Sequence, residues 1–107
     1  GMGRLREVCG TFSGAVIVVN ALYGYSDPKN VQAKAELYSR IQELAAQFRR
    51  DNGSIICKEL LGLSRPEGSP IPEARTDEYY KKRPCPELCR YSANMLEEYI
   101  REHPPVK

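Results

Sequence analysis

Apolar residues in the middle of this chain recur at the spacing of one helix face, three or four positions apart. Charged residues such as Arg40 and Arg50 fall largely on the other faces, and Gly53 follows as a helix stop. We predict a helix over Pro28–Asp51, with Ser26 or Asp27 as its cap and Pro28 at its first position. Its inner face carries Leu37, Ile41, Leu44, Ala45 and Phe48.

A second apolar segment precedes this helix. The run Val16–Val19 is β-branched and also fits a strand, but apolar character extends from Phe12 to Leu22, which is longer than a typical strand. We therefore predict a helix over Glu7–Leu22 that is buried on most sides and ends at Gly24.

The second half of the chain contains shorter elements. Ser54 can cap a helix over Ile55–Leu61, and a loop rich in proline, glycine and serine follows at 64–75. The sequence TDEYYKK allows one or two helical turns after Thr76 or Asp77. A last helix should begin near Pro86 and end before His103, because Pro104 and Pro105 cannot continue it.

These elements predict an all-α fold of about four helices, with the proline- and glycine-rich loop before the last one. The length of 107 residues suits one domain, 1–107, and Gly1 before Met2 resembles a remnant of a purification tag. A net charge of +2, with basic and acidic residues interspersed, gives no footprint for nucleic acid. No stretch is long and apolar enough to span a membrane, so we expect a cytoplasmic protein.

The chemistry resides in four cysteines, Cys9, Cys57, Cys85 and Cys89. In a reducing compartment such a set indicates metal binding or redox chemistry more often than structural disulfides, although unpaired cysteine is also a common buried residue. The predicted boundaries place Cys9 and Cys57 in first helical turns and Cys85 at a helix cap. Amide groups and the helix dipole at these positions favour the thiolate.

Cys85 and Cys89 form a C-x-x-x-C pair, which places both side chains on one helix face. Both could bind one metal ion, or be oxidised together if the first turn frays, because an intact helix keeps the sulfurs beyond bonding distance. The alternative is two half-buried thiols at the start of a core-facing helix. The spacing matches neither a thioredoxin-like site nor a zinc site with paired C-x-x-C motifs.

Gly10 and Gly14 leave one stripe of the first helix without side chains. Each glycine inside a helix lowers its stability by about 1 kcal/mol relative to alanine. Close approach of another helix or of a cofactor would offset that cost, and helix packing is the more common reason. A cofactor-binding role for Cys9, Gly10 and Gly14 is the alternative.

Three segments together resemble a bacterial and archaeal family that is named after the cysteine pattern C-GCAxxG-C-C and described as redox-active. The first, GMGRLREVCGTFSGA, matches the family's glycine motif at Cys9, Gly10, Gly14 and Ala15, with Thr11 in place of the usual alanine. The second, GSIICKELLG, contains Cys57. The third, CPELCRYSANMLEEYI, contains Cys85 and Cys89.

The resemblance implies thiol-based redox chemistry, or binding of zinc or an iron–sulfur cluster, by Cys9, Cys57, Cys85 and Cys89, with a redox protein as a possible partner. Family members usually carry an N-terminal helical stretch with a further cysteine, so we expect this chain to be short or truncated there. An enzymatic activity is left open. The alternative function is a non-catalytic helical module with structural cysteines, which would form a homo-oligomer through the helix at 7–22 to cover its apolar surface.

Overall fold

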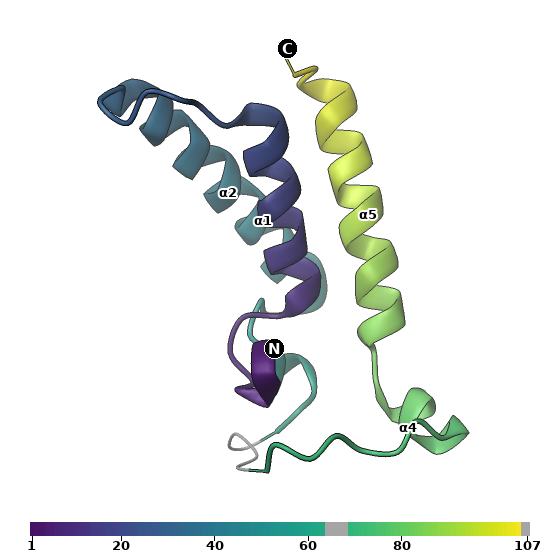
Figure 1. The fold of residues 1–107 in the computed structure, drawn as a ribbon. Helices are drawn as coiled ribbons and strands as arrows, with labels where there is room; N and C mark the ends of the chain where they lie inside the picture. The colour runs from purple at the N-terminus through teal and green to yellow at the C-terminus, as the bar shows by residue number, and fades with distance from the viewer. Residues whose placement is uncertain (64–68, 106–107) are drawn as a thin grey trace.

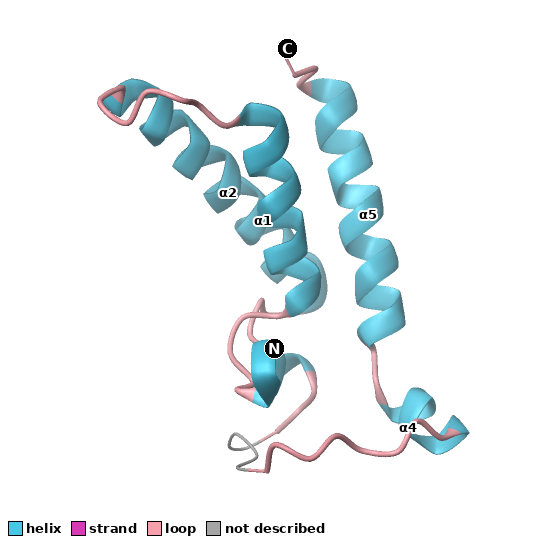
Figure 2. Cartoon of the chain, in the orientation of Figure 1, coloured by secondary structure: helices cyan, strands magenta, loops and turns pink. Residues whose placement is uncertain are grey.

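The computed structural model describes residues 1–63 and 69–105, and this part of the chain is all-α, as predicted. No strand is present among these residues, where the only β pairing is an isolated antiparallel bridge between Val8 and Ile56 (Figure 2). Nor is any helix among them long and apolar enough to cross a bilayer. The elements are the 3₁₀-helix η1 (Met2–Arg4) and the helices α1 (Gly10–Tyr23), α2 (Val31–Asn52), α3 (Cys57–Leu60), α4 (Asp77–Lys82) and α5 (Cys85–Glu102).

The first helix, α1, is the centre of the fold and packs against α2 and α5 (Figure 1). It runs in the same direction as α5, whereas α2 runs back beside it, so α1 and α5 begin at the same end of the molecule. One face of each helix is buried, and together these faces form the core. The core side chains include Phe12, Ala15 and Val19 from α1, Leu44 and Phe48 from α2, and Leu88, Met95 and Tyr99 from α5.

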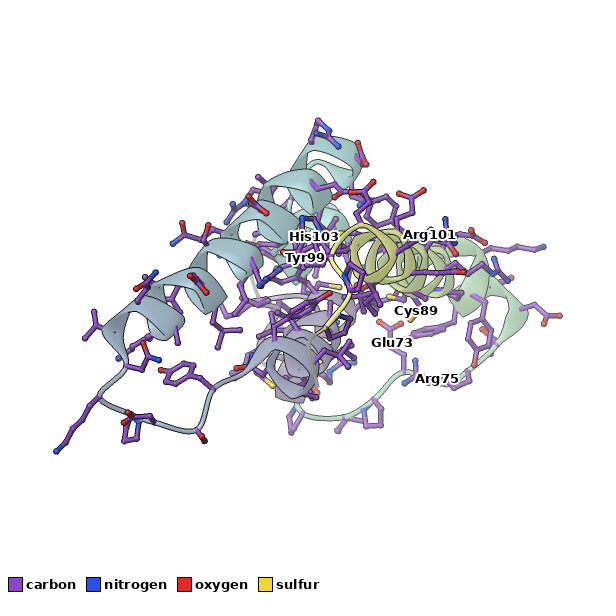
Figure 3. All side chains as sticks on the ribbon, turned by 90° about the horizontal axis from the view of Figure 1, so that it is seen from above. Glu73, Arg75, Cys89, Tyr99, Arg101 and His103 are labelled. Atoms are coloured by element: carbon purple, nitrogen blue, oxygen red, sulfur yellow. The ribbon has the colours of Figure 1, made fainter. Side chains whose placement is uncertain are left out.

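The far end of the bundle is fastened by aromatic and cationic side chains. Arg40 Nη1 on α2 donates a hydrogen bond to the Tyr99 hydroxyl at 2.9 Å, and the guanidinium lies over the Tyr23 ring. The His103 ring stacks on Tyr99 with centroids 4.2 Å apart. Figure 3 labels both residues, which lie beside each other at the end of α5. These contacts hold the late turns of α1 and α5 to α2 and leave the helix starts to form the opposite end.

Helix α2 begins three residues later than predicted, because a different residue caps it. The Asn30 side-chain oxygen accepts a hydrogen bond from the Ala33 amide at 3.0 Å, so Pro28 lies before the helix. Asp27 accepts from the Lys29 amide and holds the preceding turn. The predicted stop is confirmed: Gly53 has φ 93°, a left-handed conformation that glycine adopts at little cost.

Helix α1 also begins later than predicted. Glu7 to Cys9 lie before it, in the segment that forms the β bridge. The expectation that this helix is buried on most sides is wrong: Phe12, Ala15 and Val19 face the core, whereas Ile17 is 71% exposed and Val18 37% exposed.

The remaining boundaries differ from the predictions by a residue or two. The Ser54 hydroxyl accepts from the Ile56 amide, so Ser54 stabilises a turn and α3 begins only at Cys57. Thr76 caps α4 as predicted, by accepting from the Tyr79 amide at 3.2 Å. Cys85 is the first residue of α5 rather than its cap, and the helix ends at Glu102 as predicted. Of the predicted loop at 64–75, residues 64–68 lie outside the described residues, and 69–75 contain no helix or strand.

Candidate functional site: a thiol cavity

The starts of α1, α3 and α5 meet around one cavity of about 310 Å³, and all four cysteines line it. We call it the thiol cavity. Cys9 and Cys57 are buried, Cys85 and Cys89 are exposed, and none of them is in a disulfide. The structure thus brings together residues that are far apart in the sequence. The other lining residues are Gly1, Gly10, Thr11, Leu60, Leu61 and Leu88.

The backbone fixes the two buried cysteines relative to each other. The Cys9 amide donates to the Ile55 carbonyl at 2.8 Å, and the Cys57 amide donates to the Glu7 carbonyl at 2.5 Å. These two bonds flank the bridge between Val8 and Ile56. Because side chains alternate across an extended segment, Cys9 and Cys57 lie on the same face as diagonal neighbours.

The hydrophobic pattern of the sequence does not predict this bridge. It assigns the apolar pairs Val8–Cys9 and Ile55–Ile56 to helices, although each lies at or just before a helix start. The available signal is that Val8, Ile55 and Ile56 are β-branched residues just before helix starts, but only the fold shows that the two segments pair.

Thr11, two residues after Cys9, contributes a hydroxyl beside one of the sulfurs. Its Oγ1 lies 3.1 Å from Cys9 Sγ. Its carbonyl accepts a hydrogen bond from the Ser92 hydroxyl at 2.7 Å, which ties α5 to the first turn of α1. Thr11 therefore both contacts a thiol and helps to hold two walls of the cavity together.

Arg6 is a site residue that the sequence does not reveal. Its side chain is buried, and Nη1 donates to Cys57 Sγ at 3.9 Å. Its carbonyl accepts the Lys58 amide at 3.0 Å, and its backbone has a φ of 62°, which is uncommon for a residue with a side chain. The pairing with α3 therefore holds Arg6 in position against Cys57.

Electrostatics distinguish Cys57 from Cys85. Burial raises the pKa of Cys57, but hydrogen bonds and charge from the N-terminal ammonium and Arg6 outweigh it, so this pKa is below its ordinary value. The pKa of Cys85 is raised, first by desolvation and then by the charge of Cys9. Cys85 lies in the first turn of α5, but the prediction that this position favours its thiolate is wrong, because desolvation and the neighbouring thiols have the larger effect.

The arrangement is not by itself a metal site. Thiolates are good ligands for zinc and iron. Among the residues that the structure describes, however, no three Cys, His, Asp or Glu side chains are placed to hold one ion. The cysteines surround a cavity instead of converging on a point, so metal or iron–sulfur binding by them stays a prediction.

The glycine stripe does not provide close packing within the described chain. A Cβ built on Gly10 or Gly14 meets no heavy atom within 4 Å. Gly10 lines the thiol cavity, whereas Gly14 is not among its lining residues. The packing explanation therefore fails inside this part of the chain, and the cofactor-binding role of Cys9, Gly10 and Gly14 stays a prediction.

Comparison with known proteins agrees with the cysteine pattern. The family model described as "Putative redox-active protein (C_GCAxxG_C_C)" matches residues 1–99, nearly the whole chain. The chain belongs to this family. No curated protein and no solved structure matches it. Within the C_GCAxxG_C_C family, this chain therefore provides a structural view in which Cys9, Cys57, Cys85 and Cys89 all border one cavity.

Proposed function

We propose that the protein carries out thiol–disulfide exchange in the thiol cavity, with Cys57 as the attacking thiolate and Cys9 as the thiol that completes the reaction. The observation that carries this proposal is the contact between Cys57 Sγ and the Arg6 guanidinium, at 3.9 Å, in a pair of segments that also holds Cys9 on the same face. A cationic neighbour stabilises the thiolate, which is the reactive form of cysteine.

The exchange would proceed in two steps. The Cys57 thiolate attacks one sulfur of a bound disulfide, whose S–S bond breaks, so that a mixed disulfide forms on Cys57 and one thiolate leaves. Cys9 then loses its proton and attacks the Cys57 sulfur. The Cys9–Cys57 disulfide forms, the second substrate thiolate leaves, and two electrons have passed from the protein to the substrate.

Diagonal neighbours stand about 7–8 Å apart, which is further than a disulfide permits, so the second step requires the two segments to move closer together. The bridge itself is one residue pair, and three backbone hydrogen bonds join the two segments, so the movement would have to keep or transiently open these bonds.

The exposed cysteines would connect this buried pair to a redox protein partner. Cys85 lines the same cavity as Cys9 and Cys57, which supports a role in passing electrons to them. Cys85 and Cys89 are exposed and can meet an external dithiol. A disulfide between these two would require the first turn of α5 to open, because residues four apart on a helix hold their Cβ atoms too far apart.

Redox titration tests the proposal. The protein is equilibrated anaerobically in thiol–disulfide buffers of graded potential, remaining thiols are alkylated, and disulfides are located by peptide mapping. We expect a Cys9–Cys57 disulfide that forms at one defined potential. In Cys9→Ser, the second step is removed, so a mixed disulfide should accumulate on Cys57.

Ser13→Ala serves as the matched control, because it changes a hydroxyl on α1 that bonds only its own helix at the Gly10 carbonyl. It should titrate like the unchanged protein. Thiols that stay reduced across the whole range, or that pair in no preferred combination, would contradict the proposal. Stoichiometric iron or zinc that protects all four cysteines from alkylation would favour the metal-binding alternative instead.

A second proposal concerns self-association through α1. Ile17 and Val18 are exposed on this helix, and Gly10 and Gly14 leave open space along the same stripe, at the spacing that lets helices approach closely. A second copy of the chain would cover this surface. Light scattering over a concentration series tests it: a dimer is expected, Val18→Lys should dissociate it, and a strict monomer at all concentrations would contradict it.

A further inference from the structure

The wall of the thiol cavity is apolar. Apart from the cysteines, its side chains come from Leu60, Leu61, Leu88 and Thr11. Among the described lining residues, none has a charged side chain, and the ammonium of the lining residue Gly1 is hydrogen-bonded to Cys57. The guanidinium of Arg6 is engaged with Cys57 Sγ and stands behind the thiol rather than in the wall. The cavity therefore offers apolar contacts to a ligand and few polar ones.

The dimensions favour a small ligand over a polypeptide. A volume of about 310 Å³ lies at the lower end of the range for pockets that enclose small molecules. Cys57 is only 6% exposed, so a substrate must enter the cavity to reach its sulfur. A polypeptide disulfide would carry peptide groups into an apolar space without hydrogen-bond partners, which is costly.

The charges at the cavity further restrict the class of substrate that it would accept. The Cys57 thiolate already places one negative charge at the cavity, and it is hydrogen-bonded to the N-terminal ammonium and to Arg6. A negative charge on the substrate would be buried against apolar wall side chains, because both cationic groups are already bonded to Cys57. Neutral substrates avoid this cost.

We infer that the thiol cavity selects small, neutral, apolar disulfides as substrates, and this inference rests on the proposed function. The overall step is balanced: one substrate disulfide, the Cys57 thiolate and the Cys9 thiol give one Cys9–Cys57 disulfide, one substrate thiolate and one substrate thiol. The proton comes from Cys9, and both electrons end on the substrate.

Two chromogenic dipyridyl disulfides that differ only by carboxylate groups test the inference. Neutral dithiodipyridine and dianionic dithiodinicotinate are each mixed with the reduced protein, and the reaction is quenched at intervals for peptide mapping at Cys57. Each rate constant is divided by that of N-acetylcysteine methyl ester under the same conditions, which removes intrinsic reagent reactivity. We expect the normalised rate at Cys57 to favour the neutral reagent by about tenfold or more, the discrimination that an apolar pocket can supply.

Variants locate the selectivity. Leu61→Lys adds a positive charge to the cavity wall and should reduce the preference several-fold by accepting the anionic reagent. Ile71→Lys is the matched control, because Ile71 is 73% exposed and does not line the cavity, so its preference should be unchanged. Circular dichroism checks that both variants keep their helices.

The outcomes separate the two proposals. If the Cys9–Cys57 disulfide forms with both reagents at equal normalised rates, the substrate inference is overturned and the proposed function stands. Equal effects of Leu61→Lys and Ile71→Lys would also overturn it. If neither reagent yields that disulfide and two thiols per protein, the proposed function itself fails and the inference with it.

Discussion

At the scale of single residues, the side chain of Arg6 distinguishes Cys57 from the other cysteines. Arg6 is buried, contacts Cys57 Sγ at 3.9 Å and is fixed by its own backbone bond to Lys58. Neither the family motif nor the helix periodicity draws attention to it, since an arginine beside a glycine-rich start is typical of surface charge. Its importance follows only from the pairing of the first segment with α3.

Arg6→Gln should therefore raise the pKa of Cys57 toward its ordinary value, because charge and hydrogen bonding to the thiolate are both weakened. We expect alkylation of Cys57 near neutral pH to slow several-fold, and its pH profile to shift upward. Mass spectrometry of iodoacetamide-treated protein measures both. Arg6→Lys keeps the charge and should recover part of the rate, whereas an unchanged profile in Arg6→Gln would show that the guanidinium does not activate Cys57.

Tyr91 joins α5 to the end of α2 by donating a hydrogen bond to an Asp51 carboxylate oxygen at 2.5 Å. Burial and then this hydrogen bond raise the pKa of Tyr91 to about 12. We expect a tyrosine that titrates near pH 12 in the ultraviolet tyrosinate spectrum, and its loss in Tyr91→Phe. Asp51→Asn should lower the pKa of Tyr91.

The sign of the linked stability follows from the raised pKa. The neutral Tyr91 phenol contributes stability that is present below its ordinary pKa and is lost as the pH rises through about 12. If Asp51→Asn left the titration of Tyr91 unchanged, burial alone would account for the shift. Tyr38→Phe, at an exposed position on α2, is the control for removal of a hydroxyl.

At the scale of elements, the sequence predicts helices well and their starts poorly. The stop of α2 at Gly53 and the end of α5 before His103 depend on glycine, proline and periodicity, which are local. The starts of α1 and α3 depend on the bridge between Val8 and Ile56, which joins segments that local rules treat separately. The cap of α2 is hard to predict because three residues with cap-forming side chains precede the helix, and Asn30 is the one that bonds the Ala33 amide.

Two glycines on different elements should respond in opposite directions to alanine. Gly53 has φ 93°, so Gly53→Ala should destabilise the fold by about 1 kcal/mol. Gly14 lies inside α1 with open space where the methyl group of an alanine would stand, so Gly14→Ala should stabilise a dilute, monomeric sample by about 1 kcal/mol. Urea denaturation followed by circular dichroism measures both.

The Gly14 experiment also bears on self-association. At higher protein concentration, an added methyl on the stripe should weaken a close contact between two copies of α1. Destabilisation by Gly14→Ala in dilute solution would contradict the open surroundings of this position, and stabilisation by Gly53→Ala would contradict its left-handed conformation.

At the scale of the whole molecule, the cavity exists because three helix starts meet at one end while aromatic contacts close the other. The sequence identifies Cys9, Cys57, Cys85 and Cys89 as a set, through their types and the motif, but offers no means of telling a point-like cluster from a cavity wall. That distinction depends on how α5 crosses α1, and on residues such as Thr11 and Ser92 that join them. The same distinction decides whether the four cysteines could bind one metal ion or could exchange disulfides with a ligand in the cavity.

Oxidation of the buried pair should stabilise the whole fold. A Cys9–Cys57 disulfide closes a long loop and restricts the unfolded chain, whereas the folded chain already holds both segments side by side. A loop of this length corresponds to about 2–4 kcal/mol of stabilisation, less any strain from the movement that bonding requires. We expect the urea midpoint to rise on oxidation and to return when the disulfide is reduced.

Cys9→Ser provides the comparison, because it removes this disulfide and should make the midpoint independent of redox potential. The measured difference between oxidised and reduced stability also sets how readily the disulfide is reduced. If oxidation stabilises the fold only slightly, an external dithiol can reduce the Cys9–Cys57 disulfide and so regenerate both thiols for another exchange. A midpoint that rises equally in Cys9→Ser would assign the stabilisation to another cysteine pair and remove Cys9 from the proposed exchange.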